Sequence, residues 1–129
     1  MNVLLSIQPR FVEKIFLKEK VFEYRKSIFR NKEIDRVFIY ESKPTKKIVG
    51  EFRVKNIICD KPQSLWEKTG NKSGVSKDFF DKYFCNKEKA YAIEIMDLIQ
   101  YKVPIDPYVE NPNFIAPQSF CYMKEQSNF

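Results

Sequence analysis

Three charged residues in one short stretch, Lys20, Glu23 and Arg25, are the first candidates for chemistry in this sequence. Alternate side chains of an extended strand point to the same face, so Glu23 and Arg25 would lie side by side. An arginine can hold a phosphate through two parallel hydrogen bonds, and a lysine adds a compact point charge. The glutamate would orient the arginine or accept a hydrogen bond from a base. The set indicates a nucleotide site; the plainer alternative is a salt bridge on an exposed strand face.

Other residues would extend such a site. Positive charge would come from Lys26, Arg53 and Lys89, a base would stack on Tyr91, and Ser119 would donate a hydrogen bond to the ligand. Each of them has an ordinary alternative. Lysines and arginines are usually solvated surface residues, aromatic residues usually pack in the core, and serines often form turns.

The composition favours a polyanionic partner and excludes several kinds of catalytic centre. The chain of 129 residues carries a formal net charge of +6 and contains no histidine, which excludes histidine-based triads, dyads and zinc sites. Its three cysteines show no CxxC spacing, so we expect reduced thiols, no metal and no cofactor. Neither a signal peptide nor a membrane-spanning apolar run is recognisable, which predicts a cytoplasmic protein without membrane partners.

The pattern of apolar residues predicts strands and short helices without regular βαβ alternation. We expect strands over 3–7, 20–28, 37–40, 47–58 and 90–101. We expect helices over 10–18, after Pro62 and after Ser76, with a flexible loop over 70–74 between the last two. Gly50 within a strand predicts a bulge or a close backbone approach. These elements predict one α+β domain over residues 1–129 with a mixed, strongly curved sheet.

The stretch from Lys18 to Arg25, KEKVFEYR, resembles the signature GxKxxExR of the ASCH domain family. Lys20, Glu23 and Arg25 occupy its K, E and R positions, and further matches lie at 48–52, 74–80, 89–93 and 116–120. The resemblance implies a PUA-like fold, in which short helices pack around a curved mixed sheet or β-barrel. It also implies a cleft between the barrel and the helices, with the signature residues at this cleft.

One residue departs from the family pattern. Lys18 stands where the signature has glycine. If that glycine provides a positive φ in the turn before the strand, a lysine there would cost about 1 kcal/mol. We therefore expect the turn to be built differently in this chain.

The resemblance also implies a function, because proteins of this family are thought to bind RNA, often as accessory proteins of transcription or translation. A few are enzymes: one branch removes the acetyl group from N4-acetylcytidine, and a ribonuclease is known in another. The amidohydrolase branch uses the motif lysine, a threonine at the position of Glu23 and a loop glutamate, whereas this loop offers Asn71, Lys72 and Ser73. We therefore favour a protein that binds RNA or a nucleotide in a basic cleft. Hydrolysis of a modified nucleoside or of RNA, with Lys20 and Glu23 as the acid–base pair, is the alternative, and a protein-interaction domain is a third interpretation.

Overall fold

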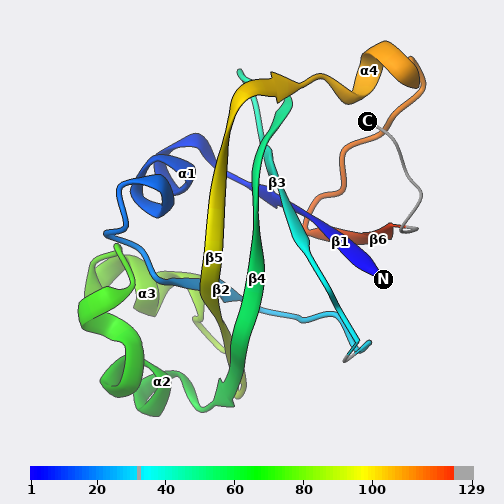
Figure 1. Cartoon of the computed structure of the whole chain (residues 1–129). Coiled ribbons are helices and arrows are strands. Elements are labelled where there is room, and N and C mark those ends of the chain that lie inside the picture. The colour runs from blue at the N-terminus through cyan, green and yellow to red at the C-terminus, as the bar shows by residue number, and fades with distance from the viewer. Residues whose placement is uncertain (32, 124–129) are drawn as a thin grey trace.

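The computed structural model describes residues 1–31 and 33–123 (Figure 1). Six strands, four α-helices and one 3-10 helix follow one another along these residues, in this order: β1 (Asn2–Ile7), α1 (Pro9–Phe16), β2 (Phe22–Arg25), β3 (Val37–Glu41), β4 (Lys47–Asp60), α2 (Pro62–Thr69), η1 (Gly70–Lys72), α3 (Lys77–Tyr83), β5 (Ala90–Ile105), α4 (Pro107–Glu110) and β6 (Phe120–Met123). None of the helices in this described part of the chain is long and apolar enough to cross a membrane.

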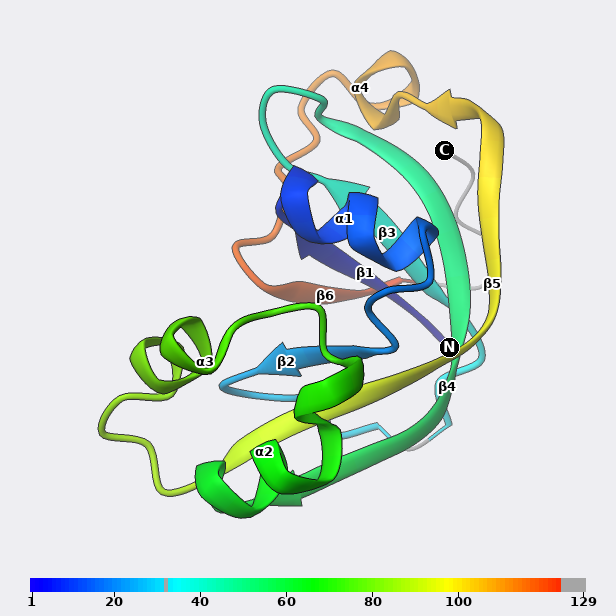
Figure 2. The same ribbon diagram turned by 90° about the vertical axis from the view of Figure 1, so that its left-hand side faces the viewer.

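The strands form one mixed sheet in the order β2-β5-β4-β3-β1-β6. Among the described strands, only β1 and β3 are paired in parallel; the other neighbours are antiparallel. The long strands β4 and β5 bend along their length, and the sheet curls into a half-barrel (Figures 1 and 2). The expected α+β class with a curved mixed sheet is thereby confirmed.

Helix α1 closes the inside of the half-barrel. Pro9 occupies the first turn, where its missing N–H costs no hydrogen bond, and Val12 and Ile15 point into the main core. On β4, a Cβ at Gly50 would lie 2.5 Å from the Ile99 carbonyl oxygen and 2.8 Å from Cζ of Phe16. The ladder is irregular beside this glycine, so both the predicted bulge and the predicted close approach are found.

Helices α2 and α3 form a second layer beside β2 (Figure 2). The Ser76 side chain accepts a hydrogen bond from the Phe79 backbone N–H at 3.1 Å and caps α3, as its position before the helix predicts. The Tyr24 ring packs edge-to-face against Phe80 with 4.9 Å between ring centres. Aromatic packing on one face of β2 thus fixes this strand against the helices.

Two expectations about the segments around the signature need correction. The strand predicted over 20–28 is confined to β2, and Lys20 precedes it. The segment 70–74, expected to be a flexible loop, begins with a 3-10 turn, and Ser73 within it is fully buried. The backbone N–H of Val21 donates to the Lys72 carbonyl at 2.8 Å. The segment before β2 and the segment after α2 are therefore joined, although about fifty residues separate them in the sequence. Local sequence patterns do not reveal such a contact.

The turn after α1 also differs from expectation. Lys18 has a φ of +63°, so it adopts the left-handed conformation that the glycine of the signature would provide. The Lys18 N–H donates to the Ile15 carbonyl and the Glu19 N–H donates to the Lys14 carbonyl, both at 3.0 Å. This is the hydrogen-bond pattern of a glycine-terminated helix. The turn keeps that shape despite the lysine, and the prediction that it is built differently was wrong.

We therefore predict that Lys18→Gly stabilises the protein. Glycine removes the steric cost of the left-handed conformation, and we expect the free energy of unfolding to rise by about 1 kcal/mol. Urea denaturation measures this change. Glu19→Gly is the control: Glu19 has no positive φ, so a glycine there only adds freedom to the unfolded chain and should lower stability. Equal destabilisation by both substitutions would contradict the prediction.

Candidate functional site

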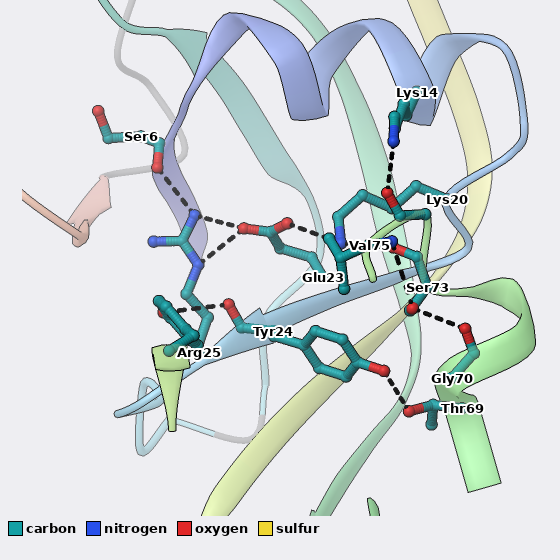
Figure 3. Close-up of polar contacts among 12 residues, drawn as sticks. Ser6, Lys14, Lys20, Glu23, Tyr24, Arg25, Thr69, Gly70, Ser73 and Val75 are labelled. Atoms are coloured by element: carbon teal, nitrogen blue, oxygen red, sulfur yellow. Dashed lines mark hydrogen bonds and ion pairs between the residues drawn. The ribbon is translucent and has the colours of Figure 1, made fainter. Parts of the chain in front are cut away.

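The three signature residues converge on one cavity of about 360 Å³ between the half-barrel and helix α3 (Figure 3). The cavity is lined by residues from the end of β1, helix α1, strand β2, the β3–β4 connection, helix α3 and the segment before β6: Ser6, Ile7, Gln8, Phe11, Lys20, Glu23, Tyr24, Arg25, Ser42, Val75, Phe79, Tyr83 and Gln118. The side chains of Lys20, Glu23 and Arg25 thus share one hollow although β2 is only four residues long.

Glu23 lies at the centre of this group. Its Oε2 accepts a hydrogen bond from Arg25 Nε at 3.0 Å and forms an ion pair with Arg25 Nη2 at 2.8 Å. Its Oε1 lies 3.7 Å from Lys20 Nζ. All three residues are buried, with 3–7% of each exposed. Glu23 and Arg25 share a strand face, as the period-two pattern predicts, but that face is turned into the protein rather than outward. The alternative of a salt bridge on an exposed strand face therefore does not describe them.

Lys20 is held by backbone and aromatic groups as well as by Glu23. Its Nζ donates to the Ser73 carbonyl at 2.8 Å and lies 5.3 Å and 5.1 Å from the ring centres of Phe11 and Tyr24. Burial lowers the pKa of the Lys20 ammonium below its ordinary value, and the carboxylate of Glu23 partly opposes this shift. The arrangement favours a lysine that releases its proton more readily than a solvated one.

The backbone beside Lys20 requires a glycine. Gly74 has a φ of +69°, and a Cβ at this position would lie 2.9 Å from Cβ of Lys20. Its carbonyl accepts a hydrogen bond from Lys14 Nζ at 2.8 Å. Two lysines, one from α1 and one before β2, therefore bind consecutive carbonyls of the segment that follows η1, and this fixes the wall of the cavity.

Arg25 connects three segments of the sheet. Its Nη2 donates to the Ser6 carbonyl at 2.8 Å, at the end of β1, and its Nη1 lies 3.3 Å from Ser119 Oγ and 3.5 Å from the Ser119 carbonyl oxygen. The Nε/Nη2 edge faces Glu23, so this edge is not open to a phosphate as a two-hydrogen-bond fork. Nη1 makes the longest contacts and is the nitrogen best placed to turn toward a ligand.

The other predicted site residues divide into two groups. Ser119 contacts Arg25, and Lys26 lies with its Nζ 4.7 Å from the ring centre of Tyr83, which lines the cavity. These two contact lining residues without lining the cavity themselves, whereas Arg53, Lys89 and Tyr91 neither line it nor extend its charge. Arg53 pairs with Asp35 at 3.2 Å on the outer side of β4, Lys89 is exposed before β5, and Tyr91 is the ladder partner of Arg25.

Several lining residues were not predicted from the sequence. They come from segments far from the signature, and the residues concerned are Ser6, Gln8, Phe11, Ser42, Phe79 and Tyr83. The apolar stripe of α3 does predict that Phe79 and Tyr83 lie on one face, but not that this face borders a cavity. Among the described residues, no group of three or more His, Cys, Asp or Glu lies close enough together to hold a metal ion.

Comparison with known proteins identifies the family and the fold of this chain. A family model described as a domain of unknown function, DUF365, matches residues 1–116. The crystal structure of ASCH from Zymomonas mobilis superimposes with a TM-score of 0.87 at 26% identity, covering 96% of this chain and 88% of that one. This chain belongs to the DUF365 family and is an ASCH domain. A tyrosine-to-phenylalanine variant of the same Zymomonas protein superimposes equally well, with a TM-score of 0.87.

Two relatives are similar to this ASCH domain in sequence. An ASCH domain-containing ribonuclease of Zymomonas mobilis is 26% identical over 127 residues, covering 97% of this chain and 86% of that protein. A large ribosomal subunit protein uL22 of Ureaplasma parvum is 32% identical over 125 residues, which is 95% of this chain. The chain spans only 39% of the length of that ribosomal relative.

The buried position of Lys20 predicts a specific dependence of stability on pH. Its pKa in the folded protein lies below the 10.5 of a free lysine. Between these two values the chain takes up a proton on unfolding, so raising the pH through this window stabilises the folded protein. Below its pKa in the folded protein, Lys20 is charged in both states, and the full cost of burying its ammonium remains. We expect the stability of the wild type relative to Lys20→Met to rise as the pH increases toward 10.5.

Urea denaturation of both proteins from about pH 7 to about pH 10 measures this difference. Lys72→Met is the matched control, because Lys72 is exposed on the neighbouring 3-10 turn. Its stability relative to the wild type should stay constant over the same range. A difference between the wild type and Lys20→Met that stays constant or falls with pH would contradict the assigned effect of burial.

Proposed function

We propose that this ASCH domain binds RNA or a nucleotide in the cavity formed around Lys20, Glu23 and Arg25. The observation that carries the proposal is that all three side chains line one hollow instead of separate surfaces. A cavity of about 360 Å³ lies within the size range of small-molecule sites. The net charge of +6 adds an attraction for any phosphate-bearing ligand.

The cavity offers the kinds of contact that a nucleobase needs. Phe79 and Tyr83 lie nearly parallel, with ring centres 5.9 Å apart and an angle of 14° between the rings, and both line the cavity. Unpaired bases stack on such aromatic rings. The amides of Gln8 and Gln118 and the carboxylate of Glu23 are hydrogen-bonding groups for the edge of a base. These contacts support a ligand that combines a base with a phosphate.

Two relatives support the same class of function. One is named a ribonuclease and another a protein of the large ribosomal subunit. Both names concern RNA, although they belong to those proteins. These two names favour RNA over DNA as the polymer to which this domain binds.

Arg25→Lys tests the proposed site. Lysine keeps the positive charge but cannot reproduce the contacts that the guanidinium makes with Glu23, Ser6 and Ser119. We expect the affinity for single-stranded RNA to fall roughly tenfold, as the loss of a hydrogen bond to a charged group predicts. Fluorescence anisotropy at low and at moderate salt measures it. Arg53→Lys, outside the cavity, is the control. Unchanged RNA affinity in Arg25→Lys would refute the proposed site.

Hydrolysis of RNA is the second candidate, and the buried position of Lys20 favours it. A lysine with a lowered pKa beside a carboxylate is suited to proton transfer. The amidohydrolase reaction on N4-acetylcytidine has less support, because Glu23 replaces the threonine of that branch and Arg25 engages its carboxylate.

A cleavage assay separates binding from hydrolysis at this site. If Lys20 transfers a proton, Lys20→Met should abolish RNA cleavage while much of the RNA binding remains. Labelled RNAs and N4-acetylcytidine are incubated with the wild type and with Lys20→Met, and products are separated by size or by chromatography. Cleavage at the same rate in both proteins would exclude Lys20 as the acid–base group.

A further inference from the structure

A second cavity of about 430 Å³ adjoins the first one. The two cavities share three lining residues, Ser6, Ser42 and Gln118. The second cavity lies between the β3–β4 connection and α4, which meet at the same end of the molecule (Figure 2). Its own lining includes Lys43, Lys46 and Tyr108, so the two hollows form one groove with a charged extension.

The two lysines of the extension are not neutralised. Lys43 and Lys46 are both exposed, and neither forms an ion pair within residues 1–31 and 33–123. The lining of this second cavity contains no carboxylate. The nearby Glu41 accepts a hydrogen bond from Thr45. Asp106, outside the lining, accepts a hydrogen bond from the Tyr108 backbone N–H at 2.9 Å. The charged side chains that line this cavity among the described residues are therefore the two lysines.

An aromatic ring holds the side chain of Lys46 in place. Its Nζ lies 5.1 Å from the ring centre of Tyr108, a cation–π contact that places the ammonium over α4. The Tyr108 hydroxyl in turn lies 3.2 Å from the hydroxyl of Tyr40. The ammonium is therefore held at the wall of the cavity, and less side-chain freedom would be lost when it binds an anion.

In the first cavity the cations are paired with a carboxylate. Its two cations, Lys20 and Arg25, flank the carboxylate of Glu23 and donate to the carbonyls of Ser73 and Ser6. A phosphate placed there would compete with Glu23 for the same donors and would be repelled by its charge. The uncompensated cations of the groove are Lys43 and Lys46, and this divides it into a polar, aromatic part and a cationic part.

We propose that the groove takes a single-stranded polynucleotide rather than a free nucleoside. One base occupies the first cavity, and the phosphate that links it to the adjoining nucleotide lies on Lys43 and Lys46. This inference rests on the proposed function and specifies the substrate class of the same site. The base and the phosphate of the ligand are thus assigned to the two different cavities of one groove.

The experiment compares ligands with and without phosphate. Affinities are measured for the four ribonucleosides, their 5′-monophosphates and five-nucleotide single-stranded RNAs of uniform A, C or U sequence. We expect the five-nucleotide RNAs to bind more tightly than the monophosphates. In the double variant Lys43→Ala/Lys46→Ala, the affinity for these RNAs should fall roughly tenfold, and the slope of log affinity against log salt should decrease by about one. Nucleoside binding should not change.

Lys61→Ala/Lys87→Ala is the matched control. It removes the same charge from two exposed lysines that line neither cavity, so it should change the affinity much less. Equal loss in both double variants, or RNAs that bind no better than monophosphates, would overturn the inference while the proposed function stands. If nucleosides, monophosphates and RNAs all fail to bind the wild type, the proposed function falls and this inference falls with it.

Discussion

The buried carboxylate of Glu23 is the constraint on which this part of the structure depends. Only 5% of Glu23 is exposed. Burying a carboxylate in this way is costly unless opposite charges and hydrogen-bond donors surround it. Lys20 and Arg25 supply them, and both cations need further acceptors, which are the backbone carbonyls of Ser73 and Ser6. Removing one partner of such a buried pair typically costs about 3–5 kcal/mol. One ionic group thereby joins β1, β2 and the segment after η1.

This internal pairing also limits what the signature can do to a ligand. The strong donors of Arg25 face Glu23 and Ser6, so the first cavity is not a simple cationic phosphate pocket. Its polar groups and stacked aromatic rings suit a base better than a phosphate. The exposed Lys43 and Lys46 beside it form no ion pair with any of the described residues. A net charge of +6 therefore says less about binding than the places where positive charge is left uncompensated.

The path of the chain into the site is fixed by backbone conformation more than by residue type. Lys18 keeps the left-handed turn that ends α1 although it is not a glycine, and two residues later Lys20 enters the cavity. Gly74 packs directly against Lys20 and leaves no room for a Cβ there. A steric cost of about 1 kcal/mol at one turn is small compared with the hydrogen bonds and burial that this turn positions. The surrounding structure therefore overrides a local preference.

The sequence by itself determined the α+β class, the helix after Pro9, the close backbone approach at Gly50, and the shared strand face of Glu23 and Arg25. These features follow from short-range periodicity and sterics, which one segment expresses alone. Only the tertiary structure decided that this face is buried and lines a cavity, and that Arg53 lies elsewhere. The reason is that the curl of the sheet and contacts such as Lys20 with Ser73 join distant segments. The same type of charged residue can be buried or solvated, and only the packing around it decides which.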